Sequence, residues 1–144
     1  MTGSIAIDAE RAFTRAARGR RRAALARRLR RAPADAARLC VYGEPRVPRL
    51  RAVGGPGVRE IPIDAISGTL EPSRAALFDR CFRPAGRARS RWESVWLAEH
   101  QGAVLPPISV VAVDGGYAVR DGHHRVSVAK ARGAVSIDAM VDAA

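Results

Sequence analysis

The chain contains little of several residue types that would narrow its function. Its 144 residues include one lysine, two cysteines and 5% aromatic residues. Cys40 and Cys81 form neither a CxxC pair nor a metal-ligand cluster, so no metal site is expected and both thiols are expected in the core. No apolar run is long enough to span a bilayer, and the basic start lacks the apolar segment of a secretory signal. These absences favour a protein of the reducing cytoplasm.

The formal net charge of +11 resides almost entirely in the first part of the chain. Residues 1–58 carry 14 arginines and four acidic residues, whereas residues 59–144 carry 11 basic and 10 acidic residues. A basic segment of this kind can bind the phosphates of DNA or RNA, or the surface of an anionic membrane. Alanine and arginine are abundant throughout the chain, so excess arginine is by itself weak evidence for nucleic acid.

Three regions are predicted: a basic helical arm at 1–42, a Gly/Pro-rich linker at 43–58 and a domain at 59–144. In the arm, a helix is expected over residues 8–31, with Asp8 as its N-cap. Nucleic acid is the favoured partner of this helix, and an anionic membrane is the less favoured one; a solvated helix or a partly disordered arm is the plainer alternative. The candidate nucleic-acid contacts are Arg20, Arg21, Arg22, Arg27 and Arg28.

The domain combines strand-like and helix-like patterns. Helical spacing of apolar residues predicts two helices, capped by Ser73 and Ser90. The second carries Trp92 and Trp96, which are expected in the core, with a stacking platform for a base as the alternative. The strands are expected at 59–63, 108–113, 117–119 and 137–141, with a hairpin turn at 114–116. The pattern predicts an α/β (α+β) fold, in which a small mixed sheet with packed helices follows an Arg-rich helical arm.

The most informative motif is Asp121-Gly122-His123-His124-Arg125, which lies between a predicted strand and a predicted helix. A helix that begins at such a turn has unpaired amides at its amino end, and these favour an anion. Arg125 could add a bidentate contact to phosphate oxygens, and the two histidines could add donors near pH 7. The plainer alternative is a turn in which Asp121 caps the helix and the histidines are solvated.

In the order of these elements, residues 59–141 resemble the ParB/sulfiredoxin superfamily, the fold of the ParB N-terminal domain. Members hold nucleotide phosphates at the strand–turn–helix motif, so the resemblance implies a phosphate site that includes Arg74, which matches an arginine of the ParB pattern. The other implied site residues are Asp121, Gly122, His123, His124 and Arg125.

The motif departs from two branches of the superfamily and is similar to a third. ParB partition proteins carry Gly-Glu-Arg-Arg there and bind CTP, and the missing acid puts CTP hydrolysis in doubt. Sulfiredoxins carry a nucleophilic cysteine where His123 stands, which argues against their chemistry. The free-serine kinases also carry Asp-Gly-His with an arginine soon after. That likeness implies a general base after the first strand, for which Glu71 is the candidate and Asp64 and Asp79 are the fallback candidates. The alternative is that Glu71 is an ordinary surface carboxylate.

The leading hypothesis is therefore a ParB-like module that binds a nucleotide or phosphate and associates with DNA through its basic arm. The expected cofactor is a nucleoside triphosphate or diphosphate, with or without Mg²⁺. The first alternative is a free-serine-type kinase of small molecules, and the second is a catalytically silent interaction protein. Whether the protein is an enzyme stays open at this point, as do its oligomeric state and the identity of the nucleotide.

Overall fold

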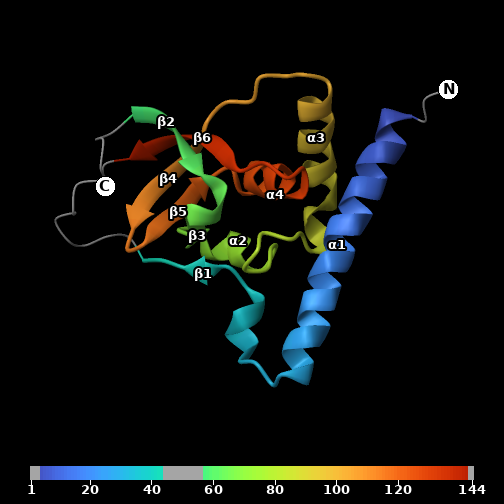
Figure 1. Ribbon diagram of the computed structural model, residues 1–144, viewed down its shortest axis with the longest axis vertical. Coiled ribbons are helices and arrows are strands. Elements are labelled where there is room, and N and C mark those ends of the chain that lie inside the picture. Colours follow the sequence, from blue (N-terminus) through green and yellow to red (C-terminus); the bar gives the residue numbers. More distant parts are fainter. Residues whose placement is uncertain (1–3, 44–56, 143–144) are drawn as a thin grey trace.

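The computed structural model describes residues 4–43 and 57–142, which form a mixed sheet with helices beside it (Figure 1). Helix α4 (His123–Ala131) packs between the sheet and α3 (Arg89–His100), and the long α1 (Ile5–Leu29) runs along α3. The predicted α/β (α+β) fold with a small mixed sheet after an Arg-rich helix is confirmed. None of the described helices is long and apolar enough to cross a bilayer.

The sheet has the strand order β1-β3-β5-β4-β6-β2. Its strands are β1 (Cys40–Val41), β2 (Gly57–Pro62), β3 (Ile66–Thr69), β4 (Ile108–Val113), β5 (Gly116–Asp121) and β6 (Ser136–Asp142). The β4–β5 hairpin is antiparallel, β3 pairs with β5 and β4 with β6 in parallel, and β2 closes one edge antiparallel to β6. The hairpin at 114–116 is therefore as predicted. Most of the linker predicted at 43–58 lies outside the described residues.

Two apolar clusters stabilise this arrangement. The first lies between the sheet and α4, where Val110, Val119 and Val126 are fully buried. The second joins α1, α3 and α4 through Phe13, Trp92 and other buried apolar residues. The Phe13 ring meets the Trp92 ring edge-on, with 5.5 Å between centroids. Such an edge-to-face contact adds to the free energy of area burial.

Helix α1 begins earlier than predicted and is packed through a different face. Ser4 caps it, because its hydroxyl accepts a hydrogen bond from the amide of Ala6 at 3.3 Å, and Asp8 lies within the first turn. The sequence pattern of Leu25 and Leu29 suggested an apolar stripe in the carboxyl half, but both side chains are exposed. The helix instead buries residues near its amino end, namely Ala9, Ala12 and Phe13.

The helix expected from Ser73 is only one turn long, as α2 (Pro72–Ala75). Phe78 and Phe82 are buried nonetheless, because the chain turns sharply after it. The Asp79 carboxylate accepts hydrogen bonds from the amides of Cys81 and Arg83, each at 2.9 Å, and Phe82 has a φ of 59°. A carboxylate that holds amides in this way competes with a helix.

Two smaller predictions are also wrong. Cys40 and Cys81 are both exposed free thiols, not core residues, since Cys40 lies on the short edge strand β1 and Cys81 in the turn after α2. Ser90 lies inside α3, whose N-cap position is Ala88. The remaining short elements are 3-10 turns at Ala34–Ala37, Ile63–Ala65 and Gly86–Ala88.

Candidate functional site

The amino end of α4 is built on a glycine that no other residue can replace without strain. Gly122 occupies the N-cap position with φ 109° and ψ 23°, a conformation that side chains disfavour. A Cβ at this position would lie 2.5 Å from Cγ2 of Ile108 in β4. Because Gly122 makes this turn, β5 leads directly into α4, and the first amides of the helix have no partner within it. Such amides favour a bound anion.

His123 lies under this helix end and is nearly inaccessible, with 4% of its surface exposed. Its Nε2 forms a 2.6 Å hydrogen bond with the hydroxyl of Thr69 on β3. The same hydroxyl accepts the amide of Glu71 at 2.8 Å. Thr69 thereby links the start of α4 to the segment before α2. Sequence reasoning did not identify Thr69, because a threonine within a strand gives no signal of its own.

His124 is also buried, with 8% of its surface exposed. Phe78 packs against both imidazoles: its ring meets His124 edge-on at 5.2 Å and lies nearly parallel to His123 at 6.4 Å. The two histidines therefore form part of the packed structure at this end of the helix. The alternative of solvated surface histidines is not what the structure shows.

Burial, more than any single charge, determines the protonation of these two rings. It lowers the pKa of His123 to about 4, assisted by the Arg74 cation and His124 and opposed by Asp121. Burial likewise lowers the pKa of His124 to about 4, assisted by the cations of Arg91 and Arg74. Both imidazoles are therefore neutral at pH 7, and that of His123 acts as a hydrogen-bonding group toward Thr69.

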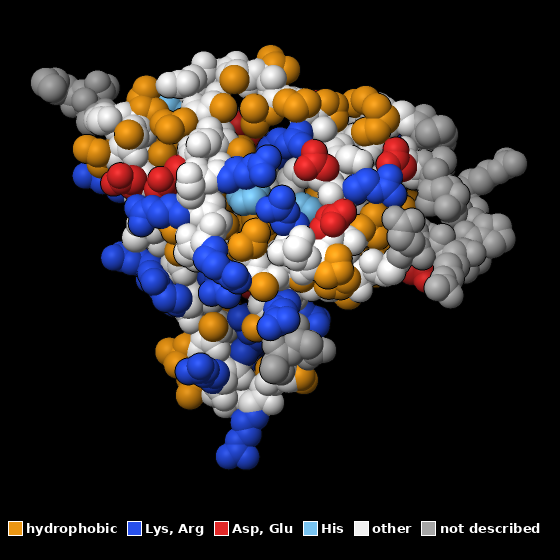
Figure 2. Space-filling model, turned by 180° about the vertical axis from the view of Figure 1, so that it is seen from behind, with side chains coloured by type: hydrophobic (Ala, Val, Ile, Leu, Met, Phe, Trp, Pro, Cys, Tyr) orange, Lys and Arg blue, Asp and Glu red, His pale blue; other side chains and the backbone are white. Residues whose placement is uncertain are grey.

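Two guanidinium groups approach this helix end from other elements. Arg74 lies on α2 and Arg91 in the first turn of α3, and each is near enough to lower a histidine pKa. On the face shown in Figure 2, histidine side chains lie among several Arg and Lys side chains. Within the described residues neither Arg74 nor Arg91 forms an ion pair with a carboxylate. Sequence reasoning found Arg74 and missed Arg91, whose role depends on how α3 is placed.

Arg125 and Asp121 are positioned differently from the two other cations. The Arg125 guanidinium donates to the carbonyl oxygens of Pro106 and Pro107, the latter at 3.1 Å, and to the Asp121 carboxylate at 3.3 Å. It thus ties the segment before β4 to the start of α4. Asp121 is 78% exposed and makes no capping hydrogen bond to the helix. An anion at this site would have to share Arg125 with these acceptors.

Glu71, the candidate base, occupies the N-cap position of α2 and is exposed. Its backbone amide donates to the Thr69 hydroxyl, and the same hydroxyl is hydrogen-bonded to His123. Asp79, considered as a fallback base, is fully buried and bonded to the turn that follows it and to Arg83. The Asp79 carboxylate therefore stabilises that turn and is not positioned as a base. Asp64, the other fallback, lies 4.0 Å from Lys130 near the opposite end of α4.

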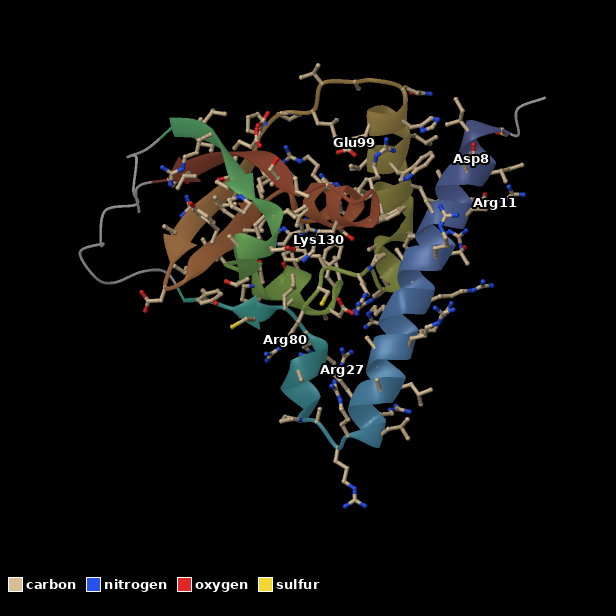
Figure 3. All side chains as sticks on the ribbon, in the orientation of Figure 1. Asp8, Arg11, Arg27, Arg80, Glu99 and Lys130 are labelled. Atoms are coloured by element: carbon tan, nitrogen blue, oxygen red, sulfur yellow. The ribbon has the colours of Figure 1, made fainter. Side chains whose placement is uncertain are left out.

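The arginines proposed for nucleic-acid contact all lie on α1. Arg21, Arg22 and Arg28 are exposed, whereas Arg20 and Arg27 are partly buried. Figure 3 shows Arg11 on the side of α1 that faces away from the sheet and Arg27 on the side toward the segment leading to β1. Charge is thus presented around the helix and is not confined to one face. In the part of the chain that the structure describes, no group of three or more His, Cys, Asp or Glu residues could hold a metal.

Comparison with known proteins adds little to this geometry. No family model and no curated protein matches the chain. Among solved structures, sulfiredoxin from Arabidopsis thaliana is similar at 23% identity and a TM-score of 0.41, over 60% of this chain and 85% of that one. A likeness at this level says nothing of activity, ligand or site residues, and the nearer resemblance to the free-serine kinases stays a prediction.

Proposed function

We propose that this protein is a ParB-like module that binds nucleotide phosphates at the amino end of α4. The observation that carries the proposal is the turn at Gly122, where β5 leads directly into α4 and the first helix amides have no partner within the helix. Arg74 on α2 and Arg91 on α3 are near enough to lower the pKa values of the two buried histidines there. Neither guanidinium has a carboxylate partner among the described residues, so both charges are available to phosphate oxygens. The helix amides and the positive end of its dipole act in the same direction.

The proposal is tested by a thermal-shift screen against ATP, ADP, CTP and GTP, each with and without Mg²⁺. A ligand at 100 times its dissociation constant stabilises the folded state by about 2.7 kcal/mol. Replacing Arg74 and Arg91 by alanine should remove that shift. Arg87→Ala is the matched control, because Arg87 is an exposed arginine of the turn before α3 and lies outside the site. A double variant that binds as tightly as the parent would show that the site is elsewhere.

A second candidate, a free-serine-type kinase, is favoured by the position of Glu71. Its backbone amide is bonded to Thr69, which in turn bonds His123, so a single residue joins Glu71 to the start of α4. In such a reaction the substrate hydroxyl oxygen attacks the terminal phosphorus of ATP, Glu71 takes the hydroxyl proton and ADP leaves. Bound Mg²⁺ would neutralise the phosphate charge.

Incubation with free serine, Mg²⁺ and ATP or ADP should then produce phosphoserine. Glu71→Gln should lower the rate by about 10²–10⁴-fold without loss of nucleotide binding, since general-base catalysis contributes on this scale. Glu93→Gln, which alters an exposed ion pair on α3, is the control. Nucleotide binding without phosphoryl transfer would exclude the kinase and support the binding module. Absence of both binding and transfer would exclude these two and support the silent interaction protein.

Association with nucleic acid through α1 is the third part of the proposal, and it is supported by the exposed Arg21, Arg22 and Arg28. Contacts of this kind are to phosphates, so the affinity for duplex DNA should fall steeply with salt. Replacing the three arginines by alanine should weaken binding and flatten the salt dependence. Equal affinity in the variant would exclude this face of α1, and binding to anionic vesicles alone would identify a membrane surface as the partner.

A further inference from the structure

A cleft of about 740 Å³ lies at the other end of α4, away from the proposed phosphate site. One wall is the middle of α1, with Ala12, Arg15 and Ala16. The opposite walls are the turn after α2 and the carboxyl ends of α3 and α4. Its volume falls in the range of about 300–1,000 Å³ that is typical of small-molecule sites. Neither the motif at the start of α4 nor the contact between α1 and α3 accounts for this cleft.

The cleft is lined by cations from three separate parts of the chain. Arg15 comes from α1, Arg83 from the turn after α2, and Lys130 and Arg132 from the carboxyl end of α4. None of its lining residues is acidic. The carboxylates that pair with three of these cations stand outside the lining: Asp79 at 3.3 Å from Arg83, Glu99 at 3.6 Å from Arg132 and Asp64 at 4.0 Å from Lys130.

Helix dipoles explain only part of this arrangement. Cations at the carboxyl ends of α3 and α4 are favourable for the helices themselves, which accounts for Lys130 and Arg132. Arg15 lies in the middle of α1 and Arg83 in a turn, so neither stabilises a helix end. The three paired carboxylates offset part of the repulsion among the four cations from outside the hollow, and an anion in the cleft would offset the rest.

The cleft also offers a flat aromatic surface. The imidazole of His100 stacks on Trp96 with 4.7 Å between ring centroids and 10° between planes. Trp96 is itself buried and is flanked by the Arg132 guanidinium at 5.5 Å from the ring, whereas His100 is exposed. An imidazole fixed in this way keeps one face for a planar ligand. Stacking on such a surface is independent of base identity.

We propose that this cleft binds a nucleotide unit, with its phosphate among the four cations and its base on His100. The nucleotide can be free or part of a single strand, because both present the same phosphate and planar ring. This site is separate from the one proposed at the amino end of α4 and does not depend on it. Arg74→Ala should therefore leave binding in the cleft unchanged.

The chain carries a built-in reporter for this proposal. Cys81 lines the cleft as an exposed free thiol, and Cys40 is an exposed free thiol on β1, outside the cleft. Alkylation of the whole protein with N-ethylmaleimide is followed at each cysteine by mass spectrometry. Saturating ATP, or a single-stranded 15-mer of deoxythymidine, should slow alkylation of Cys81 at least fivefold and leave Cys40 unaffected. An alkylation rate of Cys81 that neither probe lowers, relative to the rate without ligand, would overturn the proposal.

Affinity measurements on matched variants provide the second arm. Arg15→Ala with Lys130→Ala should weaken binding of the labelled 15-mer at least tenfold, and His100→Ala about tenfold, since stacking on one base has an effect of this size. Arg11→Ala with Arg18→Ala removes the same charge from exposed positions outside the cleft and should change affinity less than threefold. An equal loss of affinity in both double variants would mean that the 15-mer binds by general charge attraction and not in the cleft, which would overturn the proposal. If ATP competes with the 15-mer, the free nucleotide is a ligand; if only the 15-mer protects Cys81, the site belongs to single strands.

Discussion

Helix α1 and the amino end of α4 are both surrounded by arginine, but the two regions use it in opposite ways. On α1 the guanidinium groups surround a helix that buries only Ala9, Ala12 and Phe13 among its 25 residues. At the amino end of α4, Arg74 and Arg91 face two histidines that are almost fully buried. Helix α1 presents positive charge to solvent along its length, whereas Arg74 and Arg91 place positive charge beside the two histidines at one helix end.

The contrast shows that position in the fold, and not the number of cations, distinguishes a diffuse basic surface from a defined site. Exposed cations on a helix attract any polyanion, and salt screens that attraction. Arg74 is partly buried and Arg91 is exposed, so what distinguishes these two cations is that elements of the fold hold them beside one helix end. The first three predictions below each alter one of the two regions, and the fourth alters a bond between α3 and α4, which connect them.

The largest effect is expected where α1 is attached. Phe13→Ala removes a ring that is 4% exposed and packed on Trp92, so it should lower the free energy of unfolding by about 3–5 kcal/mol. Leu25→Ala, on the exposed half of the same helix, should change it by less than about 0.5 kcal/mol. Urea denaturation of both variants checks this. Similar values would mean that the amino half of α1 is not docked through Phe13.

The next effect concerns the turn before α4. Gly122→Val forces a side chain into a positive φ and against Ile108, so it should cost about 2–5 kcal/mol from strain and overpacking together. Gly115→Val, in the hairpin turn, has φ 76° and nothing within 4 Å, so it isolates the strain at about 1–2 kcal/mol. A calorimetric comparison separates the two terms. Equal losses in the free energy of unfolding would show that the Ile108 side chain moves aside at no cost.

Protonation of the buried histidines gives a smaller, pH-dependent effect. Both have pKa values of about 4 in the folded protein against about 6.5 when unfolded, so the unfolded chain binds more protons between these values. The free energy of unfolding should therefore fall as pH falls, by on the order of 2 kcal/mol for each imidazole between pH 7.5 and pH 5. Urea denaturation at several pH values should show a flatter profile for His124→Gln. His100→Gln, at an exposed ring, is the control, and an unchanged profile for His124→Gln would contradict the assignment.

The smallest effect is expected at the bond that joins α3 to α4. The indole nitrogen of Trp92 donates to the Ser127 hydroxyl at 2.8 Å, and that hydroxyl donates to the carbonyl of Phe82. Ser127→Ala leaves both buried partners without a hydrogen bond and should cost about 1–3 kcal/mol. Ser94→Ala removes an exposed hydroxyl from α3 and should be nearly neutral. Chemical denaturation distinguishes the two, and a neutral Ser127→Ala would mean that water replaces the hydroxyl.

The sequence predicted the elements whose signals are local. The hairpin at 114–116, β4 and α4 were found because glycine turns and apolar alternation mark them directly. Helix α2 was overestimated, since helical spacing of Leu77 and Phe78 cannot reveal that Asp79 binds the following amides and ends the helix. Local patterns therefore located the elements correctly but overestimated the length of α2.

The candidate site was predicted in part, for a related reason. The motif at 121–125 marks its own turn, so Gly122 and the two histidines were identified correctly as a group at a helix start. Thr69 and Arg91 reach them from β3 and α3, across about 50 and 30 residues of chain. The depth at which the histidines lie depends on Phe78 and on the packing of several elements. No single segment encodes these long-range properties.

The distance along the chain between Phe13 and Trp92 has a consequence for biosynthesis. About 80 residues separate the two rings that dock α1. At 5–20 residues per second, a ribosome needs roughly 4–16 s to add them. During that interval the nascent helix has no tryptophan surface on which to bury Phe13. Helix α1 is thus synthesised first and can dock only after α3 has been made.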